Sequence, residues 1–386
     1  MNFDLPKNIH QVLNTLISNG HKAYIVGGCV RDLLCGKTPH DYDITTSALP
    51  QETLSLFEKT IATGLKHGTI TVMIDDTPIE VTTFRTESIY TDSRHPESVN
   101  FVTDIKDDLA RRDFTVNAMC YNENEGLIDI FGGADDIDHK ILRAVGDAKT
   151  RFTEDALRIL RLFRFAATLE FDIAKDTFDA AICCAPLLKN ISAERIFCEL
   201  QKASMGNNTS VIMPLLETNA LENYCIGSAD LTVIKKLAPR IDLRTFALLN
   251  LTSYNLTKTL DNFKCSNSFK DYCIKMNFLV NLGFNSDKIS VKKALSYADY
   301  NIVCDALLYY QDVLNIDVSR HQMSLNEVIA AKEPYKISHL DVSGKDITAL
   351  GYSGKQVGEK LDYLLQEVIK NPNINIKEKL LKLICN

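Results

Sequence analysis

Hydrophobic positions in the first hundred residues change between a helical period and a strand period. Apolar residues recur every three or four positions over 9–17, which predicts an amphipathic helix that ends at Gly20. Residues 23–26 are continuously apolar and predict a short buried strand. Residues 69–74 and 79–84 read as strands on either side of an Asp-Asp-Thr-Pro turn, which predicts a β-hairpin. The N-terminal part is therefore expected to mix helices and strands.

The pattern becomes helical further along the chain. Residues 127–130 and 140–144 predict the last two strands, so the mixed domain is expected to end near residue 146. A helix is predicted over 152–169, where apolar residues form one buried stripe. From about residue 172 the chain reads as helices only. An α+β domain followed by an all-helical part is the resulting prediction.

Composition limits the class of protein. A chain of 386 residues is too long for one small core, so two to four modules are expected. No apolar run reaches membrane-spanning length, and the first residues do not resemble a signal peptide. The net charge of −7 argues against indiscriminate nucleic-acid binding. The eleven cysteines include no Cys-x-x-Cys, which predicts buried free thiols in the cytoplasm, for example Cys29, Cys120, Cys198 and Cys304.

The stretch after the first predicted strand carries the chemistry. Gly27 and Gly28 lack a Cβ, so their backbone N–H groups can approach a phosphate closely. A short helix predicted over 29–35 would direct its positive end at the same anion. Asp41 and Asp43 stand two apart, which on a strand directs both carboxylates to one face. Two carboxylates that close favour Mg²⁺ with phosphate oxygens, so the stretch predicts nucleotidyl transfer.

Glu80 lies on the second strand of the predicted hairpin, on the face opposite Ile79 and Val81. It is a candidate third carboxylate for the same metal chemistry. A partly solvated strand glutamate is the competing interpretation. Taken singly, a Gly-Gly pair and an Asp-x-Asp pair are also common in ordinary turns and loops, and only their order and spacing favour a site.

Together, the glycine pair, Arg31-Asp32 and Asp-x-Asp resemble the DNA polymerase β-type nucleotidyltransferases. Within that class the chain looks like the class II tRNA nucleotidyltransferase (CCA-adding) and bacterial poly(A) polymerase family. The resemblance implies a polymerase β-like head followed by an all-α neck, body and tail. It also implies that Gly28 and Arg31 hold a nucleoside triphosphate. The expected domains are a head over 1–146, a neck over 147–205, a body over 206–315 and a tail over 316–386.

A second motif of that family is Arg-Arg-Asp-Phe-Thr-x-Asn-Ala, which begins here at Arg111. An Arg-Arg pair at a helix end is ordinarily a solvated partner of the helix dipole. The resemblance implies instead that Arg112 contacts the triphosphate, with Asn117 and Asp113 as organisers of the site.

Four side chains on the helix predicted over 152–169 recur every three residues: Asp155, Arg158, Arg161 and Arg164. An Asp–Arg pair at this spacing is usually a surface salt bridge. Next to a nucleotidyltransferase head, the carboxylate can accept from an exocyclic amine while the guanidinium donates to a ring acceptor, a pattern that suits CTP and ATP and mismatches GTP and UTP. The family's Glu-Asp-x-x-Arg-x-x-Arg motif, matched from Glu154, is interpreted as this template, which leaves Arg161 and Arg164 for phosphates or the RNA end.

Two further segments resemble the family. Residues 85–101 include Asp-Ser-Arg-His-Pro, similar to the loop of CCA-adding enzymes, with His95 in place of the usual second arginine. That loop disfavours an enzyme that adds only C. Residues 337–371 resemble the family's tail, where Lys355 and a helix start could hold tRNA or could form an ordinary capped helix.

The expected function is CCA addition to the tRNA 3′ end from CTP and ATP, without a template, by two-metal Mg²⁺ chemistry in the cytoplasm. A poly(A) polymerase is less favoured because the C-terminal end is short and only mildly basic. A partial enzyme that adds only CC or only A, and a nucleotide-binding regulatory module, stay open as well. The second half contains no His-Asp phosphohydrolase signature, so no phosphatase activity is expected. The sequence does not specify an oligomeric state.

Overall fold

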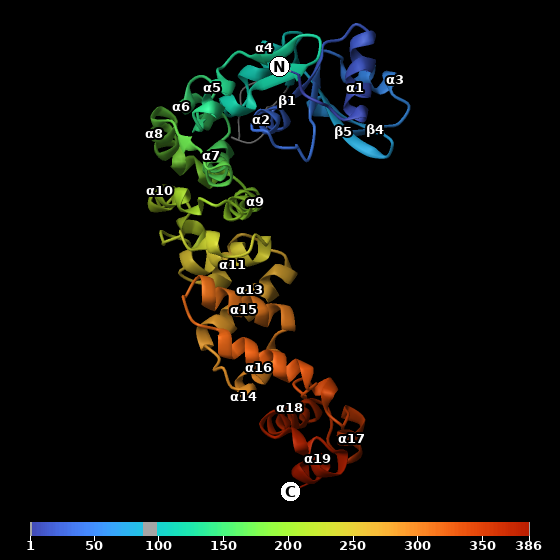
Figure 1. Ribbon diagram of the computed structural model, residues 1–386, viewed down its shortest axis with the longest axis vertical. Coiled ribbons are helices and arrows are strands. Elements are labelled where there is room, and N and C mark those ends of the chain that lie inside the picture. The colour runs from blue at the N-terminus through green and yellow to red at the C-terminus, as the bar shows by residue number, and fades with distance from the viewer. Residues whose placement is uncertain (1, 88–98, 386) are drawn as a thin grey trace. The chain divides into compact units, whose positions relative to one another are not determined.

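The computed structural model describes residues 2–87 and 99–385. The chain divides into two compact units, Met1–Asp230 and Leu231–Asn386 (Figure 1). Each unit contains its own cluster of buried hydrophobic side chains. The finer division predicted at residues 146, 205 and 315 stays a prediction. The expected fold class, an α+β head followed by helices, is confirmed.

A seven-stranded mixed sheet forms the head of the first unit, with the strand order β3-β4-β5-β2-β1-β8-β9. Strands β2 and β5 are parallel, and the other neighbours are antiparallel. The predicted first strand and hairpin are confirmed, and the hairpin turns at Asp75 and Asp76, which both have positive φ. The strands are β1 (Ala23–Val26), β2 (Ile44–Thr46), β3 (Thr60–Gly64), β4 (Thr69–Ile74), β5 (Thr77–Thr83), β8 (Met119–Asn122) and β9 (Gly126–Asp129).

Two short ladders lie outside this sheet. Strand β6 (Arg85–Glu87) pairs antiparallel with β7 (Val99–Phe101). Strand β10 (Ile141–Leu142) pairs parallel with β11 (Asp172–Ile173). The strand predicted over 140–144 is present as β10, outside the seven-stranded sheet, whereas the prediction of helices only from residue 172 is wrong because β11 lies there. A two-residue strand is too short to show a period, and its partner follows only after two helices.

Helices cover the sheet and continue the first unit beyond it. The predicted helix over 9–17 is confirmed as α1, with Ile9, Val12, Leu13 and Leu16 buried. Against the sheet, Ile105 and Leu109 of α4 pack on Tyr24, Phe84 and Cys120. The helices are α1 (Lys7–Ser18), α2 (Gly28–Leu34), α3 (Pro50–Leu56), α4 (Ile105–Ala110), α5 (Gly133–Asp138), α6 (Ala148–Glu154), α7 (Leu157–Leu169), α8 (Lys175–Cys184), α9 (Ala193–Ser204) and α10 (Met213–Glu217).

The helix predicted over 152–169 is interrupted. Helix α6 ends at Glu154, and α7 begins at Leu157. Asp155 between them is extended, with φ −136° and ψ 103°, and its Oδ1 accepts from the Leu157 N–H at 3.0 Å. An Asp side chain that bonds the backbone two residues later competes with the helical ladder. The sequence periodicity correctly predicted the buried stripe but not this break.

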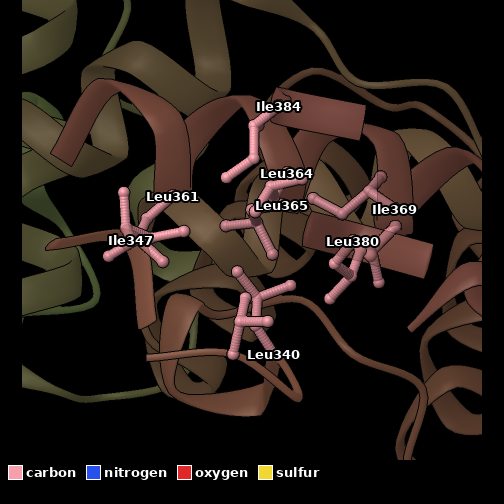
Figure 2. Close-up of a cluster of buried hydrophobic side chains, with 10 residues drawn as sticks. Leu340, Ile347, Leu361, Leu364, Leu365, Ile369, Leu380 and Ile384 are labelled. Carbon is pink, nitrogen blue, oxygen red and sulfur yellow. The ribbon is translucent and has the colours of Figure 1, made fainter. Parts of the chain in front are cut away.

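The regular elements in the described part of the second unit are all helices. Its C-terminal end is held by a cluster of buried leucine, isoleucine and valine side chains from α17, α18, α19 and the segment before them (Figure 2). Helix α17 begins with a capping box between Ser343 and Asp346. The helices are α11 (Ile241–Thr252), α12 (Leu256–Asn262), α13 (Asn267–Leu282), α14 (Lys288–Tyr297), α15 (Tyr300–Asp312), α16 (Ser319–Ala330), α17 (Gly344–Ala349), α18 (Lys355–Lys370) and α19 (Lys377–Ile384).

All eleven cysteines are free thiols. Cys29 and Cys120 are buried as predicted, but Cys198 is exposed and Cys304 only half-buried. The apolar neighbours of Cys198 in sequence lie on the buried face of α9, whereas Cys198 lies on its outer face. Within the described ranges, no helix is both long enough and apolar enough to cross a membrane.

Candidate active site

Three carboxylates line one cavity of about 640 Å³ in the head: Asp41, Asp43 and Glu80. Asp41 and Asp43 lie in the extended segment just before β2, and the Asp43 carbonyl accepts from the Val26 N–H at 2.9 Å. Glu80 comes from β5, the parallel neighbour of β2. Strand β2 begins only at Ile44, so both aspartates precede it, and the pairing of β2 with β5 brings Glu80 to the cavity that they line.

Electrostatic contacts indicate that these carboxylates act on one another. Water reaches Asp43 through the cavity, yet the surrounding protein removes enough hydration to raise the pKa of its carboxyl. Glu80 and Asp41 raise that pKa further by like-charge repulsion, whereas Arg112 lowers it. A group of negative charges that disfavours its own ionisation is suited to a cation.

The donor set is compatible with a hard divalent metal. All of these donors are carboxylate oxygens, the ligands that Mg²⁺ prefers. Among the residues that the structure describes, no three His, Cys, Asp or Glu side chains form a group that could hold a metal. If Asp41 and Asp43 hold a divalent metal, as predicted, its further ligands would be oxygens of water or of a phosphate group. The role of Glu80 as a third carboxylate stays a prediction.

The glycine pair connects the sheet to an arginine of the head. Gly27 has φ +82°, and a Cβ at this position would lie 2.9 Å from Nη1 of Arg112. The Gly27 N–H donates to the Met119 carbonyl at 3.1 Å, so Gly27 contributes space for Arg112 and not a free donor. The sequence argument that its N–H faces a phosphate is therefore wrong. Gly28 opens α2, where the first N–H groups have no partner within the helix.

A chain of side-chain contacts joins α2 of the head to α7. Arg31 donates to Oδ1 of Asn117 at 2.6 Å, and Asn117 donates to Oδ1 of Asp113 at 3.2 Å. Arg161 on α7 binds the other oxygen of Asp113 through Nε at 2.8 Å and Nη2 at 2.6 Å. Three predicted site residues and the predicted organiser Asp113 thus form one network.

The predicted base-selecting residues are both held by neighbouring elements. Arg158 donates to Glu154 Oε2 at 2.8 Å and to the Arg111 carbonyl at 2.9 Å. Asp155 is 3.5 Å from Nη2 of Arg195 on α9. Arg158 is therefore held by α6 and by the head, and Asp155 contacts α9.

Three residues that contact the predicted site arginines were not identified from the sequence. Phe165 on α7 lies under three arginine side chains, Glu199 on α9 binds Arg164 at 2.6 Å, and Asp108 on α4 binds Arg112 at 3.3 Å. Asp108 is fully buried; burial opposes its ionisation, but Arg111 and Arg112 hold its pKa below the ordinary value. A carboxylate one turn before an Arg-Arg pair was a usable signal for Asp108. The isolated Phe165 offered none.

The loop that includes His95 lies outside the described residues, and the short ladder of β6 and β7 is the part of 85–101 that can be described. In the tail, Gly354 caps α18, and the exposed Lys355 lies 3.6 Å from Glu359. The capped helix start is present, and a role in tRNA binding stays a prediction.

Two family profiles match the chain. The profile described as "Poly A polymerase head domain" matches residues 23–143, and "Probable RNA and SrmB- binding site of polymerase A" matches residues 170–225. The first covers the sheet, the carboxylates and the Arg-Arg-Asp motif. The second begins just after α7.

Known proteins are similar over the whole chain. The CCA-adding enzyme of Oceanobacillus iheyensis is 35% identical, with 97% of this chain and 96% of that relative aligned. The CCA-adding enzyme of Streptococcus sanguinis is 52% identical, but the alignment spans about half of each chain, 50% of this one and 48% of the relative. The crystal structure of the Bacillus stearothermophilus CCA-adding enzyme in complex with CTP has a TM-score of 0.80 at 32% identity and covers 95% of this chain and 93% of its own. The chain therefore belongs to the family of the CCA-adding enzymes, which are nucleotidyltransferases.

Proposed function

We propose that this protein adds C, C and A to the 3′ end of tRNA, taking CMP from CTP and AMP from ATP and releasing pyrophosphate. The carrying observation is the convergence of Asp41, Asp43 and Glu80 on one cavity beside Arg112, in a chain similar over its full length to a CCA-adding enzyme. The crystal structure of the Bacillus stearothermophilus relative contains CTP. The free thiols suit the cytoplasm, where we place the activity.

In this proposal the carboxylates and the arginines divide the reaction between them. Asp41 and Asp43 would hold Mg²⁺, which when bound lowers the pKa of the attacking ribose hydroxyl and neutralises charge on the leaving pyrophosphate. Arg31, Arg112 and Arg161 hold the triphosphate. Their guanidinium groups are already oriented by Asn117, Asp108 and Asp113, so little reorganisation is needed when an anion binds.

Base selection is assigned to Asp155 and Arg158. The Asp155 carboxylate accepts from the exocyclic amine that CTP and ATP share, and the Arg158 guanidinium donates to the neighbouring ring acceptor. GTP and UTP present an oxygen and a ring N–H at these places, so both hydrogen bonds are mismatched. The Arg195 and Glu154 contacts fix the direction of the two side chains before a base arrives.

The test uses the full chain, Mg²⁺ and three tRNAs that end before CCA, after C and after CC. Each tRNA receives single labelled nucleotides, and products are sized at single-nucleotide resolution. We expect two C additions and one A addition, then a stop, with GTP and UTP refused. A matched Asp43→Asn protein should add nothing.

Three other outcomes would each indicate a different function. The head profile is named for poly(A) polymerase, and open-ended A tails on any RNA would establish that activity instead. Products that stop after CC would indicate a CC-adding enzyme. Binding of CTP without any incorporation would leave a regulatory nucleotide-binding module.

A further inference from the structure

Phe165 lies at the centre of the arginine cluster that links α2 and α7. The Cζ atoms of Arg164, Arg31 and Arg161 lie 3.9, 5.3 and 5.4 Å from the centre of its ring. The ring is 7% exposed and packs edge to face on Phe114 of the head, at 5.8 Å and 84°. Three cation–π contacts at one buried ring are far more than the usual frequency of about one such contact per 70–80 residues.

The three guanidinium groups repel one another. Burial lowers the pKa of Arg164, and repulsion from Arg161 and Arg31 adds to this, opposed by Glu199 and Asp113. Carboxylates alone would compensate such a cluster, but they would also cancel the positive charge that a triphosphate must meet. An aromatic face attracts cations through its quadrupole and carries no net charge. Phe165 therefore stabilises the arginines without reducing the charge they offer.

The position of the Phe165 ring also allows it to fix the orientation of the arginine side chains. Phe114 directly follows Asp113, whose carboxylate binds Arg161. Phe165 thus contacts the head segment that carries the counter-ion as well as the guanidinium groups that this segment orients. A displaced ring would remove one contact from Arg31 and from Arg161 at the same time, because both pack on it.

We propose that Phe165 is a positioning residue for nucleotide binding, whose π face holds Arg31, Arg161 and Arg164 in the orientation that accepts a triphosphate. This inference rests on the proposed function, because it takes the anion to be CTP or ATP. The plain alternative is a core phenylalanine that fills space. That alternative requires only an apolar side chain of the same size, whereas our proposal requires an electron-rich ring.

Graded fluorination of the ring distinguishes the positioning role from the space-filling role. Full-length proteins carrying 4-fluoro-, 3,5-difluoro- or 3,4,5-trifluorophenylalanine at position 165 keep the ring's shape while its quadrupole weakens. Labelled CTP and ATP binding is measured by equilibrium dialysis. We expect log Kd to rise in step with fluorination for both nucleotides, reaching about three- to thirtyfold for the trifluoro ring, the range of a lost buried cation–π contact.

The matched control is Phe163, which is buried on the same helix and packs edge to face on Phe178 at 6.3 Å, and has no arginine or lysine over its ring in the described chain. Fluorination there should leave both Kd values unchanged. Phe165→Tyr, which keeps the quadrupole, should bind more tightly than Phe165→Leu, with thermal unfolding followed for all variants.

Three results overturn the proposal: a Kd that does not change across the series at 165, an equal change at 163 and 165, or equal binding by the Leu and Tyr variants. Failure of the unsubstituted protein to bind CTP and to extend tRNA is a different result, and it would overturn the proposed function itself.

Discussion

Asp113 is a buried carboxylate that joins the head to α7 through Arg161, and Asp113→Asn tests how much this contact stabilises the fold. Its side chain accepts two hydrogen bonds from Arg161, one from Asn117 and one from the Phe114 N–H at 2.9 Å. Burial alone would raise the pKa of this carboxyl. Arg161 and the hydrogen bonds outweigh burial and lower the pKa from 3.8 to about 2.

The pKa difference between the folded and unfolded states sets how much the Asp113 carboxylate stabilises the fold at each pH. A carboxyl whose pKa is lower in the folded state stabilises the fold above its unfolded pKa of 3.8, and the contribution is lost as the pH falls from 3.8 through about 2. At about 1.4 kcal/mol per pH unit, the contribution at pH 7 is about 2.5 kcal/mol. The variant also leaves Arg161 without its counter-ion, which costs about 3–5 kcal/mol for a fully buried pair. Because the Arg161 side chain is 35% exposed, we expect about 2–3 kcal/mol.

The assay is urea unfolding followed by circular dichroism at pH 7 and at several values down to pH 2. The free energy of unfolding of Asp113→Asn should fall below that of the unsubstituted protein by the stated amount at pH 7. The gap should narrow as the pH falls below 4. Asp179→Asn, an exposed carboxylate on α8, is the matched control and should change little at any pH. Equal stability at pH 7, or a gap that stays constant down to pH 2, would refute the reasoning.

Three further substitutions test the site. Asp43→Asn should reduce C and A incorporation by at least about a hundredfold while labelled CTP still binds, because it removes a metal ligand and not the triphosphate contacts; normal turnover would exclude Asp43 as a ligand. Gly27→Ala should weaken CTP binding and cost about 1–3 kcal/mol, because φ is +82° and the new Cβ would displace Arg112, and an unchanged Kd and melting temperature would contradict this. Arg158→Lys should lower the CTP-over-UTP ratio of kcat/KM, since one ammonium cannot replace a planar fork, and an unaltered ratio would remove Arg158 from base selection.

Most of the fold could be predicted because its long elements have a clear period. Strand β5 alternates exposed and buried side chains from Pro78 onward, its partner β4 is mostly buried, and α1 repeats its buried residues every three or four positions. Strand β11 and its pairing with β10 could not be predicted, because two residues show no period and the pairing depends on how intervening helices pack.

The candidate site also contains residues that could be predicted from the sequence and residues that could not. The carboxylates Asp41 and Asp43 were predicted from local spacing, and the parallel pairing of β2 with β5 then places Glu80 in the same cavity. Phe165 could not be predicted from local spacing. Its role depends on Arg31 and Phe114, which are far away in the chain and reach the ring only after α7 docks on the head.

The break between α6 and α7 separates residues of the Glu-Asp-x-x-Arg motif that a continuous helix would place on one face. In one helix, Asp155 and Arg158 would be neighbours on one face and would satisfy each other as a surface ion pair. In the structure Asp155 lies at the start of α7, where its own backbone is extended and its carboxylate bonds the Leu157 N–H. Glu154 is the last residue of α6 and forms an ion pair with the Arg158 guanidinium. The motif therefore contains a helix boundary as well as a pair of hydrogen-bonding groups. The sequence periodicity shows the spacing of the two groups but not the boundary.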